Sequence, residues 1–156
     1  MLSCADSRVP PELVFDQGLG DLYVIRVAGN IVAPSQIGSV EFAATQFGTR
    51  LVVVLGHSRC GAVLATLDEL RRPAELQSRN LRSIVDRVRP SVESLLATEP
   101  ARDPEALVRE AVRAKVRVSV HQLRHGSEIL EHLIDHDGLV VVGAEYDLGT
   151  GVVAFL

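Results

Sequence analysis

The sequence predicts an α/β fold in which a central, mostly parallel sheet is flanked by helices. Short apolar segments rich in β-branched residues alternate along the chain with longer segments of helical periodicity. This alternation is typical of parallel sheets built from strand–helix–strand units. The chain has 156 residues, a length that suggests one domain over 1–156. We expect about four parallel strands and an antiparallel C-terminal edge strand.

Five segments are expected to form the strands. The N-terminal MLS is the first, and it is followed by Leu22–Ala28 (LYVIRVA), Leu51–Leu55 (LVVVL) and Leu139–Gly143 (LVVVG). The three longer segments are near-continuous apolar runs, which favour parallel strands buried on both faces. The last segment, GVVAFL, follows the turn sequence DLGTG. We therefore expect it to pair as an antiparallel edge strand.

Three shorter helices are expected between the strands. Apolar residues recur at helical spacing from Ile37 to Phe47, and Gly48 marks the end of this helix. The segment 61–70 has a second helical pattern, which begins next to Cys60. A further helix is predicted over 127–136, and Gly138 marks its end.

Two longer helices are expected in the middle of the chain. An apolar stripe runs from Leu81 to Leu96, with Pro90 inside it as a kink or a break. Asp103 followed by proline predicts an N-cap and the first residue of a helix that extends towards Leu123. The stretch KVRVSV inside this helix alternates like a strand, so a strand is the alternative there.

The composition excludes several classes of function. Sixteen Lys and Arg against twenty Asp and Glu give a formal charge of −4, so there is no basic surface for nucleic acid or an anionic membrane. The longest apolar runs fall far short of the ~20 residues that a membrane span needs. We also find no secretory leader. The sequence therefore predicts a cytoplasmic protein with no membrane segment.

The only two cysteines of the chain lie at the ends of predicted strands. Cys4 follows the N-terminal strand, His57 follows Leu51–Leu55, and Cys60 begins the next helix, where the helix dipole favours a thiolate. The carboxyl ends of parallel strands meet at one edge of a sheet. Two thiolates and one imidazole suit zinc, and three protein ligands leave a fourth position open for catalysis. The alternative is that each cysteine is a small buried apolar residue.

Asp6 and Arg8 follow Cys4 at two-residue steps, so in an extended segment all three side chains point the same way. Arg8 can hold Asp6 through two hydrogen bonds and keep the carboxylate ionised. Such a carboxylate could orient a metal-bound water. The alternative is a surface ion pair of little energetic value. We favour the functional interpretation because Asp6 lies so close to a candidate ligand.

Four segments together resemble the β-class carbonic anhydrases: CADSRVPPE, GLGDLYVIRVAGNIV, GSVEFAATQFGTRLVVVLGHSRCGAV and VVGAEYDLGTGVV. The resemblance extends over nearly the whole chain, and the pairing of CxDSR with HxxC is highly specific. It implies one zinc ion per chain, held by Cys4, His57 and Cys60. It also implies the sheet architecture of that family.

The same resemblance implies the reversible hydration of carbon dioxide to bicarbonate and a proton by a zinc-bound hydroxide. Asp6 and Arg8 match the catalytic dyad of the family, and Tyr23 and Ala28 match positions that line its substrate pocket. Enzymes of this class are built from dimers, often paired into tetramers, with the active site at the subunit boundary. We therefore expect a homodimer or a homotetramer.

The chain begins three residues before Cys4, so we expect it to lack the N-terminal helical arm of the family and most of its first strand. A fragment, an upstream start and a shortened variant are equally compatible with this feature. Three other functions stay open. They are hydrolysis of carbonyl sulfide or carbon disulfide on the same zinc site, a zinc-loaded but inactive module, and a redox disulfide between the two cysteines.

Overall fold

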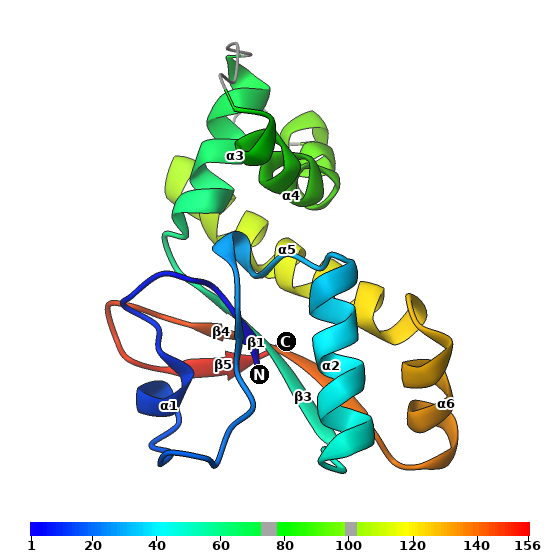
Figure 1. The fold of residues 1–156 in the computed structure, drawn as a ribbon. Helices are drawn as coiled ribbons and strands as arrows, with labels where there is room; N and C mark the ends of the chain where they lie inside the picture. Colours follow the sequence, from blue (N-terminus) through cyan, green and yellow to red (C-terminus); the bar gives the residue numbers. More distant parts are fainter. Residues whose placement is uncertain (73–77, 99–102) are drawn as a thin grey trace.

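The computed structural model describes residues 1–72, 78–98 and 103–156, which form a mixed α/β fold (Figure 1). Its sheet has five strands in the order β2-β1-β3-β4-β5. The first four pair in parallel and the last is antiparallel to its neighbour: β1 (Leu2–Ser3), β2 (Ile25–Arg26), β3 (Leu51–His57), β4 (Val140–Tyr146) and β5 (Val153–Phe155). The predicted fold class is therefore confirmed, including the antiparallel edge strand.

The helices surround this sheet. They are α1 (Pro11–Val14), the 3-10 turn η1 (Ala28–Asn30), α2 (Pro34–Gln46), α3 (Gly61–Arg71), α4 (Arg79–Thr98), α5 (Pro104–His125) and α6 (Glu128–His136). Figure 1 shows α3 and α4 side by side beyond one end of the sheet, with α2 and α6 along one side. Helix α5 packs on β3 and β4 and also contacts α4 and α6. Among the described helices, none is long and apolar enough to cross a membrane.

The two long helices follow the predicted apolar stripes. Asp103 caps α5, because its carboxylate accepts a hydrogen bond of 3.0 Å from the backbone N–H of Ala106. The alternating stretch KVRVSV lies inside α5 and is helical. Helix α4 continues through Pro90 without a break. Its stripe still reaches the core on both sides of that proline, since Val88 and Val92 are both fully buried.

The predicted strand Leu22–Ala28 is wrong in its extent. Only Ile25–Arg26 pairs as a strand, and Ala28–Asn30 forms a 3-10 turn. Two features explain the difference: β1 offers only Leu2–Ser3 as a partner, and Gly29 and Asn30 have positive φ angles of 67° and 40° that turn the chain away from the sheet. No periodic pattern indicates α1, which is a single turn.

The central strand β3 contributes to both sides of the core. Val52 and Val54 belong to the apolar cluster under α5, together with Val116. Val53 and Leu55 belong to the cluster on the opposite face. Successive residues of a strand point to opposite faces, so a run of valines is buried on both. This burial fixes the register of β3 and hence the position at which it ends.

Two glycines allow α5 to lie close to the sheet. A Cβ built at Gly56 of β3 would lie 2.5 Å from Cγ2 of Val116, and a Cβ at Gly143 of β4 would lie 2.7 Å from Cγ1 of the same valine. Any larger side chain at either position would displace the helix. Gly56 is the residue before His57, so this contact also determines where His57 lies.

The substitution Gly56→Ala should lower the free energy of unfolding by about 1–3 kcal/mol, because the added methyl group overlaps Val116 in a packed core. Urea denaturation measures this change. Gly38→Ala on α2 is the matched control, since a Cβ at that position would have no neighbour within 4 Å and alanine favours the helix. Equal effects of the two substitutions would contradict the close contact.

Candidate metal centre

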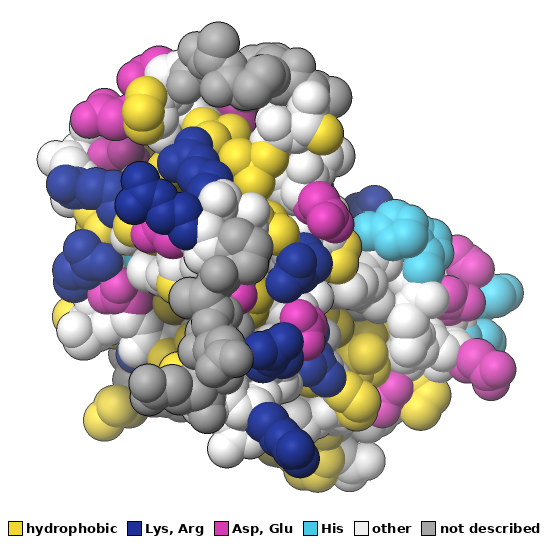
Figure 2. Space-filling view, turned by 90° about the horizontal axis from the view of Figure 1, so that it is seen from above, with side chains coloured by type: hydrophobic (Ala, Val, Ile, Leu, Met, Phe, Trp, Pro, Cys, Tyr) yellow, Lys and Arg dark blue, Asp and Glu magenta, His cyan; other side chains and the backbone are white. Residues whose placement is uncertain are grey.

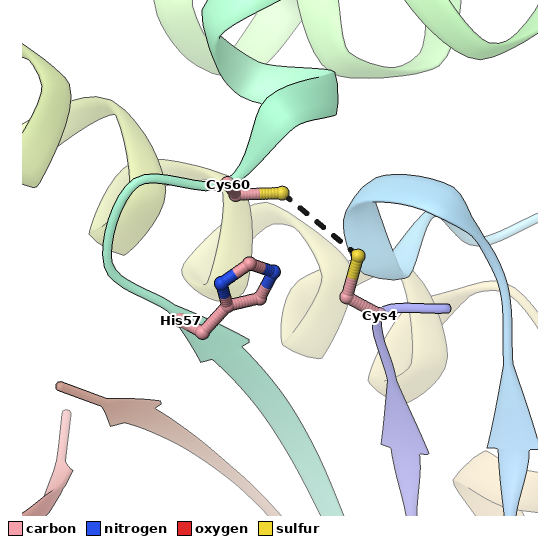
Figure 3. A group of neighbouring side chains, drawn as sticks. All are labelled: Cys4, His57 and Cys60. Carbon is pink, nitrogen blue, oxygen red and sulfur yellow. Dashed lines mark hydrogen bonds between the residues drawn. The ribbon is translucent and has the colours of Figure 1, made fainter. Parts of the chain in front are cut away.

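Three side chains that could ligate a metal ion converge where β1 and β3 end (Figure 3). Cys4 directly follows β1, His57 is the last residue of β3, and Cys60 is the N-cap of α3. All three side chains are buried, and their ligand atoms lie within 4.8 Å of one another. The structure thus brings together the three residues that the sequence singled out as ligands.

His57 turns one ring nitrogen towards the sulfurs. Its Nδ1 lies 3.0 Å from the carbonyl oxygen of Ser58, and a proton on Nδ1 would donate to that oxygen. This tautomer leaves a lone pair on Nε2, which is buried and has no hydrogen-bond partner among the described residues. Figure 3 shows this nitrogen facing the two cysteines. A buried polar atom without a partner costs free energy, and coordination of a metal would satisfy it.

The two sulfurs form a hydrogen-bonded pair. Both cysteines are free, and their Sγ atoms lie 3.9 Å apart, far beyond the ~2.05 Å of a disulfide bond. The Gly29 N–H donates to Cys4 Sγ at 3.4 Å. The hydrogen bond between the two thiols lowers the pKa of Cys4 and raises that of Cys60. Two sulfurs this close resist a second negative charge unless a cation lies between them.

This donor set fits zinc. Zinc prefers thiolate and imidazole ligands, and a divalent cation between the sulfurs would stabilise both as thiolates. The unpaired Nε2 of His57 supplies the third ligand atom. The three side chains could therefore hold one zinc ion and leave a fourth coordination position open.

An ion pair lies beside this cluster. Arg8 donates from Nε to Asp6 Oδ1 at 2.9 Å and from its terminal nitrogen Nη2 to Oδ2 at 2.6 Å. These hydrogen bonds hold the pKa of the Asp6 carboxyl well below its usual range, so the carboxylate is ionised at neutral pH. Asp6 Oδ2 lies 3.9 Å from His57 Nε2. The structure thus places an oriented negative charge next to the candidate metal ligands.

Arg26 holds the segment that carries these residues, and no spacing in the sequence indicates it. Its Nε donates to the carbonyl oxygen of Cys4 at 3.0 Å, and its terminal nitrogen donates to the carbonyl oxygen of Asp6. The parallel register places Arg26 opposite Ser3, so a correct pairing of β1 with β2 would have revealed it. One guanidinium therefore fixes the backbone on both sides of Ala5.

The two predicted pocket residues lie in different places. Ala28 begins η1 and precedes Gly29, the residue that contacts Cys4 Sγ. The Tyr23 ring instead packs beside Phe42 and Phe47, with ring centroids 6.4 Å and 5.8 Å away. Tyr23 also lines a surface pocket whose lining residues include none of the three candidate ligands. Within one chain, the structure does not bring Tyr23 to the cluster.

The remaining histidines lie on α5 and α6, and histidine side chains gather at one edge of the face seen in Figure 2. They form two pairs with ring centroids 4.6 Å and 4.5 Å apart: His121 with His125, and His132 with His136. In the part of the chain that the structure describes, the strand-end cluster is the only group of at least three Cys, His, Asp or Glu with ligand atoms this close.

Known proteins share both the sequence and the fold. A family profile described as Carbonic anhydrase matches residues 1–153. Carbonic anhydrase 2 of Mycobacterium tuberculosis is 40% identical over 151 residues, which cover 97% of this chain and 70% of that protein. The β-carbonic anhydrase CafA of Aspergillus fumigatus superimposes with a TM-score of 0.88 at 25% identity, covering 99% of this chain and 73% of that one. The chain belongs to the β-carbonic anhydrase family.

One further relative and one further solved structure are also similar to this chain. The carbonic anhydrase of Mycolicibacterium smegmatis is 39% identical over 151 residues, which cover 97% of this chain and 70% of that protein. A tetrameric β-carbonic anhydrase of Sordaria macrospora has the same fold, with a TM-score of 0.86 at 24% identity and coverage of 99% of this chain and 78% of that one. The sheet and helices of this β-carbonic anhydrase are thus those of its family.

Removing a ligand should remove the metal. We expect the unsubstituted protein to hold about one zinc ion per chain, and Cys60→Ala or His57→Ala to hold almost none after dialysis, since the loss of one donor leaves too few protein ligands. Elemental analysis by mass spectrometry measures the zinc content. His132→Ala is the control for zinc bound by surface histidines and should keep the full content. Zinc retention by both ligand variants would contradict the site.

Proposed function

We propose that this β-carbonic anhydrase catalyses the reversible hydration of carbon dioxide to bicarbonate and a proton, with one zinc ion held by Cys4, His57 and Cys60. The observation that carries the proposal is the buried, unpaired Nε2 of His57 in a cluster of ligand atoms within 4.8 Å of one another. The 40% identity to a protein named carbonic anhydrase supports the reaction.

The side chains around the cluster suit this chemistry. Zinc bound there would lower the pKa of a coordinated water and so supply a nucleophile, a chemistry for which carbonic anhydrase is the standard example. Asp6 accepts hydrogen bonds from Arg8 on both carboxylate oxygens, which fixes the plane of the carboxylate. We assign Asp6 to accept a hydrogen bond from the reacting water and orient it, and Arg8 to position Asp6.

The walls of the cluster are apolar, as an uncharged substrate requires. Cys4 and Cys60 belong to a buried cluster with Val9, Ile31 and Val63. These side chains keep bulk water away from the sulfurs, and an interaction between charges is stronger where water is excluded. Ala28 adds a small side chain next to Gly29, and we assign it to the wall of the carbon dioxide pocket.

Replacing the carboxylate should slow the reaction without releasing the metal. Asp6→Asn is expected to lower kcat/KM for carbon dioxide by about 10²-fold, since the amide no longer offers two charged oxygens that orient the reacting water. Because Arg8 holds the pKa of Asp6 below its usual range, the carboxylate is ionised between about pH 6 and pH 9, and the loss should be equal throughout. Stopped-flow hydration assays on zinc-loaded protein measure this.

Asp16→Asn, which changes an exposed carboxylate, is the control and should keep full activity. Carbonyl sulfide is the alternative substrate to test in the same preparation. Turnover of carbonyl sulfide in place of carbon dioxide would contradict the proposed reaction and support the hydrolase. Zinc retention with no turnover of either compound would support an inactive module instead.

We also propose that the chain forms a homodimer or homotetramer through a surface that includes Tyr23, Phe42 and Phe47. These three rings lie together, and they are 37%, 50% and 64% exposed. Exposed aromatic groups of this kind are typical of protein interfaces. The relative from Sordaria macrospora is tetrameric. A second copy would also be required to bring Tyr23 to a substrate pocket, since Tyr23 lies apart from the ligands of its own chain.

Charging this aromatic surface should dissociate the oligomer. We expect light scattering after size-exclusion chromatography to give a dimer or tetramer for the unsubstituted protein and a smaller species for Phe47→Glu, because a carboxylate would be buried in the interface. Leu81→Glu on α4, where the side chain is 56% exposed, is the matched control. A monomeric unsubstituted protein would contradict the assembly.

A further inference from the structure

Helix α5 carries a buried lysine that the proposed reaction does not use. Lys115 is 0% exposed, and a buried ammonium is unfavourable unless other groups compensate its charge. Burial lowers the pKa of Lys115 to about 8. The lysine is not a member of the candidate donor set.

Two hydrogen bonds lead from this lysine to the turn η1, and the backbone of that turn leads on to the candidate metal centre. Lys115 Nζ donates to Ser119 Oγ at 2.5 Å, and Ser119 Oγ donates to the carbonyl oxygen of Asn30 at 3.0 Å. All three residues are buried. The residue before Asn30 is Gly29, whose N–H donates to Cys4 Sγ. The route from α5 to the sulfur therefore passes through the turn η1.

The direction of these hydrogen bonds follows from the charge of the lysine. An ammonium group can only donate, so it occupies a lone pair of the Ser119 hydroxyl. The hydroxyl hydrogen is then free to point at the Asn30 carbonyl, and neighbouring hydrogen bonds of this kind strengthen one another. A neutral apolar side chain at position 115 would leave the hydroxyl free to rotate.

The turn that receives these hydrogen bonds needs tertiary support. Gly29 and Asn30 both have positive φ angles, 67° and 40°, a conformation that is uncommon for residues other than glycine and that asparagine adopts more readily than most. Before the turn, the Val27 N–H donates to the Ser3 carbonyl oxygen, and the Val27 carbonyl oxygen accepts from the N–H groups of Ala5 and Asn30. Strand pairing therefore holds the entry to the turn, and the residues after Val27 depend on other contacts. A Cβ at Gly29 would lie 3.0 Å from the Ala62 Cβ, which shows how closely the turn packs on α3. A small movement of the turn would separate the Gly29 N–H from Cys4 Sγ.

We propose that Lys115 and Ser119 are positioning residues of the metal centre, which fix the turn Ala28–Asn30 so that the Gly29 amide holds the Cys4 sulfur in place. This inference rests on the metal-binding part of the proposed function. Lys115 and Ser119 act through Asn30 and Gly29 and do not touch the metal themselves. Hydrogen bonds to metal ligands change metal affinity by about 10- to 100-fold when they are removed, which sets the size of the expected effect.

The test measures how fast zinc leaves the loaded protein in the presence of excess chelator. Ser119→Ala removes the hydroxyl that joins Lys115 to the Asn30 carbonyl and keeps the ammonium. Lys115→Met removes the ammonium and keeps most of the side-chain volume. Both should release zinc about tenfold faster or more. Lys115→Met should not lower the thermal unfolding temperature of the metal-free protein, since replacing a buried charge with an apolar group is often neutral or stabilising. Faster release would then not come from a weaker fold.

Leu123→Ala is the matched control on the same helix. Leu123 is fully buried in the core cluster on the sheet face, so its loss creates a cavity that lowers the unfolding temperature. It should leave the release rate unchanged. A second measurement is hydrogen exchange of the Gly29 amide in the metal-free protein, which should be faster in Ser119→Ala than in the unsubstituted protein.

Unchanged zinc release in Ser119→Ala and Lys115→Met would overturn the inference and leave the proposed function intact. Equal acceleration in Leu123→Ala would also overturn it, because the site would then respond to any loss of stability. If Lys115→Met does not unfold cooperatively, the result for Ser119→Ala decides. An unsubstituted protein that binds no zinc overturns the proposed function together with this inference.

Discussion

Close packing of α5 on the sheet is the constraint on which the rest of the structure depends. Val116 lies against Gly56 of β3 and Gly143 of β4, where no larger residue would fit. Gly56 precedes His57, so the same contact that joins helix to sheet also sets the end of the strand from which the imidazole projects. Lys115, the neighbour of Val116, begins the hydrogen bonds to η1. One helix therefore supports two of the three candidate ligands, His57 through packing and Cys4 through hydrogen bonds.

Two arginines hold the segment that follows β1. A strand of two residues has few ladder hydrogen bonds, and the backbone groups that follow it need other partners. Arg26 supplies them by donating to the carbonyl oxygens of Cys4 and Asp6, while Arg8 fixes the Asp6 carboxylate from the other side. The cations of the site thus have two effects. They hold the backbone, and they offset the negative charge of the sulfurs and the carboxylate.

The sequence predicts best where the information is local. Runs of valine identify β3 and β4, the Asp103 cap marks the start of α5, and the spacing of Asp6 and Arg8 indicates the ion pair that the structure contains. Features that depend on register between distant segments are not predictable in this way. The extent of β2 depends on how much of β1 is available to pair. The role of Arg26 depends on the same pairing.

The stretch KVRVSV is a case in which the local sequence pattern does not reveal a residue that we propose to be functional. As a strand it would place Lys115, Arg117 and Ser119 on one face, which would be an ordinary solvent-exposed polar face. As a helix it separates them, because Lys115 and Ser119 lie four residues apart on the buried face, whereas Arg117 is exposed. A lysine on a buried helix face conflicts with the usual amphipathic pattern, and conflicts of this kind concentrate at functional sites. The two polar residues that make KVRVSV look like a strand, Lys115 and Ser119, are therefore the same two that we propose to support Cys4.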